Sequence, residues 1–112
     1  MRQPRSGNRR LVCYERCRVS TEDDSQEGAV WNISVSGAYV SIDPVPPVGE
    51  RVRVTFVLPE HSGTVEVTAE VAWRNAAQSP SCPRLPYGCG LYFVDLSADD
   101  RAKISTVVDS AA

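Results

Sequence analysis

Two neighbouring stretches of the chain alternate between apolar and polar residues, and this period of two restricts the fold more than any other feature. In R-V-R-V-T-F-V-L (51–58) the apolar residues share one face and the polar residues share the other. The stretch T-V-E-V-T-A-E-V-A-W (64–73) repeats the pattern, with every second residue from Val65 to Trp73 facing inward. Because strand side chains alternate between two faces, both stretches are expected to be half-buried antiparallel strands. The short, glycine-containing link E-H-S-G (60–63) predicts that they form a hairpin.

Four more stretches have the composition of short strands, because each carries β-branched or aromatic residues between residues that break strands. They span residues 11–19, 29–33, 38–42 and 90–94. The segments D-P-V-P-P-V-G-E (43–50) and Q-S-P-S-C-P-R-L-P (78–86) are expected to be loops, since proline cannot donate a hydrogen bond to a strand ladder.

Helical character is confined to the C-terminal end of the chain. Ser97 is suited to cap a helix whose first turn contains Asp99 and Asp100. The apolar side of this helix is predicted to consist of Ala102, Ile104, Val107 and Val108. Six antiparallel strands and one C-terminal helix indicate an all-β fold, a small six-stranded β-barrel with the helix over one end. Closure into a barrel removes the exposed edges of an open sheet.

The composition is that of one globular domain. The chain has 112 residues, of which 42% are hydrophobic and 23% are charged, as in ordinary globular proteins. No apolar run approaches the roughly 20 residues that cross a bilayer. The N-terminus, M-R-Q-P-R-S-G-N-R-R, is polar and lacks the apolar core of a secretory signal. We therefore expect a cytoplasmic protein without a membrane partner.

The net charge of -2 is unevenly distributed along the chain. Residues 1–18 hold six arginines and one acid, whereas the rest of the chain holds six basic and thirteen acidic side chains. An arginine cluster on an N-terminal arm indicates an anionic partner, because the guanidinium fork fits phosphate oxygens and guanine edges. The acidic body argues against long nucleic acid, whose phosphate track would meet negative surface. A solvated basic tail is the alternative interpretation.

The chain has four cysteines, namely Cys13, Cys17, Cys82 and Cys89. Disulfides are not expected in a reducing cytoplasm. The C-x3-C and C-x6-C spacings are not the usual close pairings of zinc ligands, so no metal site is predicted. Buried reduced thiols that pack as small apolar residues are the favoured interpretation.

Two short motifs and their context resemble the PilZ domain family, a bacterial receptor module for cyclic di-GMP. The family signature is R-x-x-x-R in an N-terminal arm, followed by [D/N]-x-S-x-x-G at the start of a barrel strand. The stretches R-S-G-N-R (5–9) and N-I-S-V-S-G (32–37) supply these two elements. The proline-rich loop, the segment V-A-W-R (71–74) and the segment G-L-Y-F-V-D-L-S-A-D-D-R (90–101) also follow the family pattern. The resemblance extends over residues 5 to 110.

The resemblance implies that arm arginines bind the ligand. Cyclic di-GMP carries two phosphates and two guanines, and a guanidinium grips O6 and N7 of guanine or two phosphate oxygens with paired hydrogen bonds. These roles fall on Arg5 and Arg9. Because Arg9 and Arg10 are adjacent, Arg10 is the alternative second arginine, with Ser6 then opposite it. Residues 1–10 would form a flexible basic arm, and residues 11–112 the barrel with its helix.

The second motif implies the other wall of the site. Asn32 is suited to bind a guanine edge or to brace an arm arginine, and Ser34 to donate a hydrogen bond to phosphate. Gly37 would let the backbone approach the ligand closely or adopt a positive φ. An ordinary tight turn rich in Asn, Ser and Gly is the alternative interpretation of this motif.

Other prominent side chains are predicted to have structural roles. Trp73 is expected in the core, and His61 in a solvated hairpin turn. Trp31 and Tyr39 are expected to face outward near the motif, where either is able to pack on a purine. No pattern of catalytic residues is present, so we do not expect an enzyme, and no cofactor is predicted.

These expectations describe a receptor that binds cyclic di-GMP, closes its arm over the ligand and regulates a downstream effector in trans, in motility, pilus or biofilm pathways. One alternative is a PilZ-like interaction adaptor that does not bind cyclic di-GMP. Another is a nucleic-acid-binding barrel, which the acidic body disfavours. A homodimer is left open.

Overall fold

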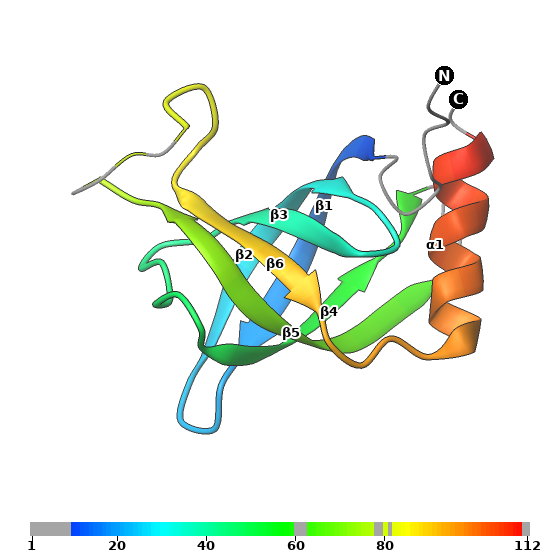
Figure 1. The fold of residues 1–112 in the computed structure, drawn as a ribbon, viewed down its shortest axis with the longest axis horizontal. Coiled ribbons are helices and arrows are strands. Elements are labelled where there is room, and N and C mark those ends of the chain that lie inside the picture. Colours follow the sequence, from blue (N-terminus) through cyan, green and yellow to red (C-terminus); the bar gives the residue numbers. More distant parts are fainter. Residues whose placement is uncertain (1–9, 60–62, 78–79, 81, 111–112) are drawn as a thin grey trace, which may run out of the picture.

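The computed structural model of the chain describes residues 10–59, 63–77, 80 and 82–110. Within this part the chain forms a closed antiparallel barrel of six strands followed by one helix, which confirms the predicted fold class (Figure 1). The order around the barrel is β1-β2-β3-β6-β5-β4, and each neighbouring pair is antiparallel. The elements are β1 (Leu11–Ser20), β2 (Ser25–Ile33), β3 (Gly37–Ser41), β4 (Arg51–Val57), β5 (Thr64–Asn75), β6 (Gly88–Phe93) and α1 (Ala98–Ser110).

The alternating pattern of residues 51–58 produces the barrel wall that it predicts. In β4, Val52, Val54 and Phe56 are buried in the core, whereas Arg51 and Arg53 are exposed. The amide of Leu58 donates a hydrogen bond to the carbonyl oxygen of Gly63 (2.7 Å). The β4–β5 hairpin is therefore confirmed. The core takes residues from all six strands and from the helix, and valine is its most frequent residue type.

A bulge in β5 makes the prediction for Trp73 wrong. The pairing of β5 with β6 shifts register between Val71 and Trp73. An extra residue in one strand turns the following side chain to the other face of the sheet. Val71 is buried, but Trp73 lies on the outer wall with 40% of its surface exposed.

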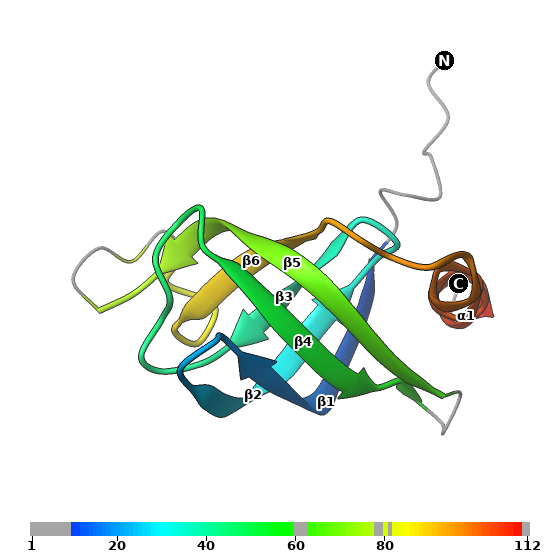
Figure 2. The same ribbon diagram turned by 90° about the horizontal axis from the view of Figure 1, so that it is seen from below.

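The helix packs against one end of the barrel, at the β4–β5 hairpin (Figure 2). Ser97 caps it as predicted, since its Oγ accepts a hydrogen bond from the amide of Asp100 (3.1 Å). Ile104 and Val108 are buried in the common core, and Val107 packs against it. Ala102, predicted on the same stripe, is exposed. The described residues contain no helix with the length and apolar character that crossing a membrane requires.

Candidate functional site

Arg10, the alternative second arginine of the arm, contacts Asn32 of the second motif on the outer wall of the barrel. Arg10 directly precedes β1, and Asn32 lies near the end of β2, opposite Val12. Nη1 of Arg10 donates a hydrogen bond to Oδ1 of Asn32 (2.8 Å). Asn32 therefore braces an arginine of the arm, one of the two roles considered for it. Partial burial lowers the pKa of Arg10 from its ordinary value, but a guanidinium stays charged in proteins.

This contact identifies Arg10 as the arginine beside Asn32 in the described part of the chain. Arg5 and Arg9 lie outside the described residues, as does His61, so their assigned roles stay predictions. The same holds for the flexible arm over residues 1–10, of which the structure describes only the last residue.

Ser34 builds the turn between β2 and β3. Its side chain is fully buried (0% exposed), and its Oγ accepts hydrogen bonds from the amides of Ser36 (3.2 Å) and Gly37 (3.3 Å). The amide of Ser34 donates to the carbonyl oxygen of Gly37 (2.9 Å), which closes the turn. A phosphate contact from Ser34 stays a prediction, and the contacts seen here are structural. Ser36, at the exposed tip, has its Oγ 3.0 Å from that of Ser34.

Sequence reasoning overlooked Ser36 as a second hydroxyl of the motif. The available signal was the S-x-S spacing inside N-I-S-V-S-G. In this turn the first serine of the S-x-S pair points inward and the second points outward. Ser36 is therefore the motif hydroxyl that faces solvent in the structure.

Gly37 is required by close packing between strands rather than by backbone conformation. The glycines with positive φ in the described part are Gly49 and Gly63, so the positive-φ interpretation of Gly37 is wrong. A Cβ at position 37 would overlap the carbonyl oxygen of Leu91 on β6. The glycine therefore lets β3 lie close to β6 directly after the Ser34 turn.

A row of residues extends across the outer wall from Asn32. The strand registers pair Asn32 with Tyr39 on β3, Tyr39 with Gly90 on β6, and Gly90 with Trp73 on β5. The indole of Trp73 fills the space over Gly90, where a Cβ would overlap it. It stacks on the ring of Tyr39, with 5.2 Å between centroids and 27° between planes. Trp73 thus forms one side of the surface around Asn32.

Tyr39 is covered by this stack and is not available to pack on a purine. Only 2% of its surface is exposed, which corrects the prediction of an accessible ring. Its hydroxyl donates to the carbonyl oxygen of Pro86 (2.5 Å) and accepts from Nδ2 of Asn75 (3.2 Å). Burial raises the pKa of Tyr39. The fully buried Asn75 also accepts a hydrogen bond from the amide of Cys82 (3.0 Å), so the loop after β5 is fastened behind Tyr39.

A second aromatic pair lies on the other side of Asn32. The rings of Tyr14 on β1 and Trp31 on β2 meet edge to face, with centroids 4.8 Å apart. Tyr14 is 67% exposed, and Trp31 is half-buried. Trp31 as a platform for a purine stays a prediction, and Tyr14, which sequence reasoning overlooked, is the more exposed of the two rings.

The thiols lie apart from this surface. Three of the four cysteines are buried in the reduced form, as predicted, and Cys82 is partly exposed. Burial raises the pKa of Cys13 to about 11 and the pKa values of Cys17 and Cys89 to about 12. The described residues contain no group of three side chains placed to hold a metal ion.

Comparisons with known proteins agree with the fold described above. The sequence model of the PilZ domain family matches residues 2–110. Among solved structures, the inhibitor of motility MotI/DgrA from Bacillus subtilis is similar over 99% of this chain and 53% of its own (TM-score 0.78, 21% identity). This chain therefore spans about half the length of that protein. No curated protein sequence matches significantly.

Two isolated PilZ domains have the same fold. One is the PilZ domain of YcgR from Escherichia coli, solved with c-di-GMP, which is similar over 90% of this chain and 86% of its own (TM-score 0.65, 11% identity). The other is the PilZ domain of CeSA from a cellulose-synthesizing bacterium, similar over 91% of this chain and 96% of its own (TM-score 0.60, 14% identity).

Proposed function

The chain belongs to the PilZ domain family, and from this premise we propose that it is a receptor for cyclic di-GMP. PilZ domains are non-catalytic receptor modules. The function to be explained is therefore how the domain binds its ligand and how that binding affects a partner protein. The observation that carries the proposal is the hydrogen bond between Arg10 and Asn32. It places one arginine, Arg10, beside the second family motif on an accessible surface, which supports a role for the arm.

The chemistry of this surface suits a doubly anionic cyclic dinucleotide. Arg10, with Arg5 and Arg9 of the same arm, supplies guanidinium groups for phosphate oxygens and for O6 and N7 of guanine. Asn32 has an amide that accepts from and donates to a guanine edge. Ser36 offers a hydroxyl at the tip of the turn.

Aromatic rings border this polar centre on both sides. The Trp73 indole lies on the β5 side, and the Tyr14–Trp31 pair lies on the β1 side. A purine has two apolar faces, and stacking on an aromatic side chain contributes about 1–3 kcal/mol per base. The ligand would therefore be held by hydrogen bonds at its edges and by stacking on its faces.

In the proposed mechanism the arm closes over the ligand. Ordering a residue costs about 1–2 kcal/mol, which the charge-assisted hydrogen bonds of the arginines must offset. The closed arm then presents a new surface to a downstream effector protein in the cytoplasm. The structural likeness to a motility inhibitor favours motility as the regulated process.

Isothermal titration calorimetry with cyclic di-GMP tests this proposal. We expect wild type to bind and the double variant Arg5→Ala/Arg9→Ala to lose binding. Arg10→Ala and Asn32→Ala are expected to bind at least about tenfold more weakly, since each removes a hydrogen bond to a charged group. Arg101→Ala, on the exposed side of α1, is the matched control and should bind like wild type. Equal heats from wild type and the arm variants would remove the arm from the mechanism.

The burial of Ser34 favours one alternative function. Its hydroxyl already accepts hydrogen bonds from two amides of the turn, so the fold alone gives a reason for serine at this position. The chain would then be a PilZ-like adaptor that binds a protein partner without the dinucleotide. A wild-type titration that gives no heat at high micromolar ligand, with the barrel folded, supports the adaptor and rejects the receptor.

A further inference from the structure

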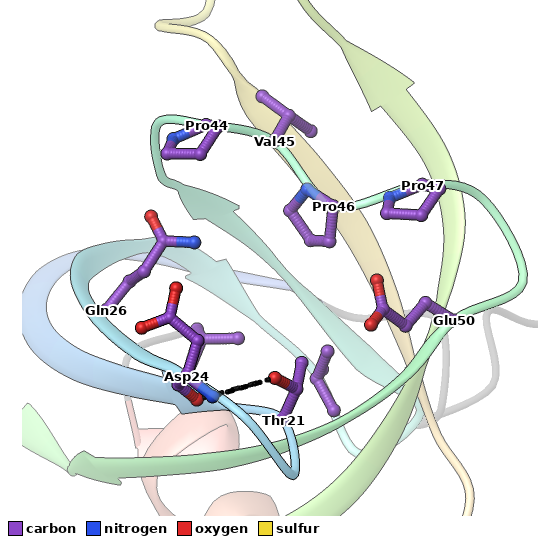
Figure 3. A pocket seen from close by; sticks show the side chains of 10 residues that line it. Thr21, Asp24, Gln26, Pro44, Val45, Pro46, Pro47 and Glu50 are labelled. Carbon is purple, nitrogen blue, oxygen red and sulfur yellow. Dashed lines mark hydrogen bonds between the residues drawn. The ribbon is translucent and has the colours of Figure 1, made fainter.

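A pocket of about 250 Å³ opens at the end of the barrel remote from Arg10 (Figure 3). It lies between the β1–β2 turn and the proline-rich loop 43–50. The length of β1, 10 residues, separates it from the Arg10–Asn32 contact by roughly 30 Å of extended strand. Three buried valines form its floor, namely Val19, Val45 and Val52. The pocket is therefore a site distinct from the proposed dinucleotide surface.

The rim of this pocket is acidic. Asp24 and Glu50 lie on opposite sides of the opening, and Gln26 lies beside Asp24 (Figure 3). None of the described residues that line the pocket is basic. In the sequence, residues 19–50 contain six acids and no lysine, arginine or histidine. The two carboxylates on the rim therefore favour a cation over phosphate in this pocket.

Both sides of the rim are held by hydrogen bonds from backbone amides. On one side, the amide of Thr21 donates to the carbonyl oxygen of Asp24 (2.8 Å), and the amide of Asp24 donates to Oγ1 of Thr21 (3.2 Å). On the other side, Gly49 and Glu50 are tied to Val71 of β5 by two hydrogen bonds (2.8 and 2.9 Å). Prolines fix the backbone between these ties. Because the rim is already ordered, less conformational entropy is lost when a ligand binds there.

The size of the pocket fits one side chain. Sites for small-molecule ligands enclose about 300–1,000 Å³, more than this pocket offers. An arginine side chain combines an aliphatic stem, which suits the valine floor and the proline walls, with a planar cation whose edges donate to carboxylates. Its weaker hydration also makes it easier to bury than a lysine ammonium.

We propose that this pocket binds an arginine side chain displayed by a partner protein. Glu50 and Asp24 accept hydrogen bonds from the guanidinium, and Gln26 accepts a further one through its carbonyl oxygen. The inference does not depend on the dinucleotide site, because it uses none of the same residues. It assigns this acidic pocket to protein recognition.

Nuclear magnetic resonance with a minimal probe tests the proposal. Acetyl-arginine-N-methylamide is titrated into the ¹⁵N-labelled full chain without cyclic di-GMP, and acetyl-citrulline-N-methylamide serves as the uncharged comparator. We expect saturable shifts at the amides of Val19, Gln26 and Val52 with arginine only. Glu50→Gln should weaken the interaction about tenfold, as the loss of a charge-assisted hydrogen bond does. Asp95→Asn, an exposed acid outside the pocket, should leave it unchanged.

Three results would overturn the proposal. The first is equal shifts with citrulline, which would show that charge is not recognised. The second is shifts spread over acidic residues around the whole barrel, which would indicate nonspecific ion pairing. The third is the same pocket shifts on concentrating the protein without probe, which would assign the pocket to the arginine arm of a second copy.

Discussion

Asn32 contacts Arg10, and the two ends of its side-chain amide lead to a specific prediction. Its Oδ1 accepts from Arg10, and its Nδ2 is the group that a carboxylate would lack. Asn32→Asp should keep the contact with Arg10 as a charge-assisted hydrogen bond and keep cyclic di-GMP binding, in line with the D/N choice in the family signature. Calorimetry of Asn32→Asp beside Asn32→Ala checks this. Equal loss of affinity in both variants would show that Nδ2, and not Oδ1, is the group used.

Ser34 makes a prediction about stability. Ser34→Ala leaves the amides of Ser36 and Gly37 without the hydroxyl that they contact in a buried turn. The loss of such a partner should lower the free energy of unfolding by about 1–3 kcal/mol. Urea denaturation measures this, with Ser110→Ala at the exposed end of α1 as the control. An unchanged midpoint for Ser34→Ala would mean that the turn does not depend on this hydroxyl.

At the scale of elements, the β5 bulge decides what the outer wall presents. It turns Trp73 outward over Gly90 and onto Tyr39. Gly90→Ala should displace the indole, because the added methyl occupies its place. In a Trp31→Phe background, which leaves Trp73 as the single tryptophan, the emission should shift to longer wavelength as the ring becomes more exposed. Ala72→Gly, at the exposed neighbouring position, is the control and should leave the emission unchanged.

The elements also show which features the sequence makes predictable. The alternation of residues 51–58 specifies β4 and its buried face, because burial there depends only on the period of the strand. Ser97 and the acids after it specify the start of α1, because a helix cap depends only on residues that are close together in the sequence. The bulge at Trp73 is different, because the apolar-polar alternation continues through Val71 and nothing in those residues marks the change of register.

Site contacts could be predicted where they follow from the hydrogen-bonding groups of a single side chain. They could not be predicted where they depend on how distant segments of the chain pack together. Bracing of an arginine by Asn32 follows from the hydrogen-bonding capacity of an amide. The covering of Tyr39 by Trp73 depends on a residue from a distant strand, so the outward register alone gives the wrong exposure. The remote pocket is assembled from two separate segments of chain, residues 19–26 and 44–52, and no local pattern in either of them indicates it.

At the scale of the whole molecule, the buried thiols link stability to pH. The folded pKa values of Cys13, Cys17 and Cys89 are raised to about 11 or 12 from an ordinary value of 9.0. Because the folded state holds these protons more tightly, their contribution is complete below pH 9 and is lost as the pH rises towards 11 and 12. Unfolding in urea between pH 8 and pH 11 should show this decline, and Cys17→Ala should flatten it. The control is Cys82→Ala, at the partly exposed position, which should keep the wild-type slope.

β1 pairs with β2 from Leu11 to Ser20, with a shift of register between Val12 and Glu15, and over Cys17–Ser20 it also pairs with β4. A strand clamped between two neighbours has no freedom to slide when the chain before Leu11 moves. In the proposed mechanism we therefore expect arm closure to leave the acidic pocket at the far end of β1 unchanged, and occupancy of that pocket to leave the arm unchanged. A partner protein that contacts both the closed arm and the pocket would bind more tightly when cyclic di-GMP is bound. The binding free energies of the arm contact and of the pocket contact would then add without cooperativity.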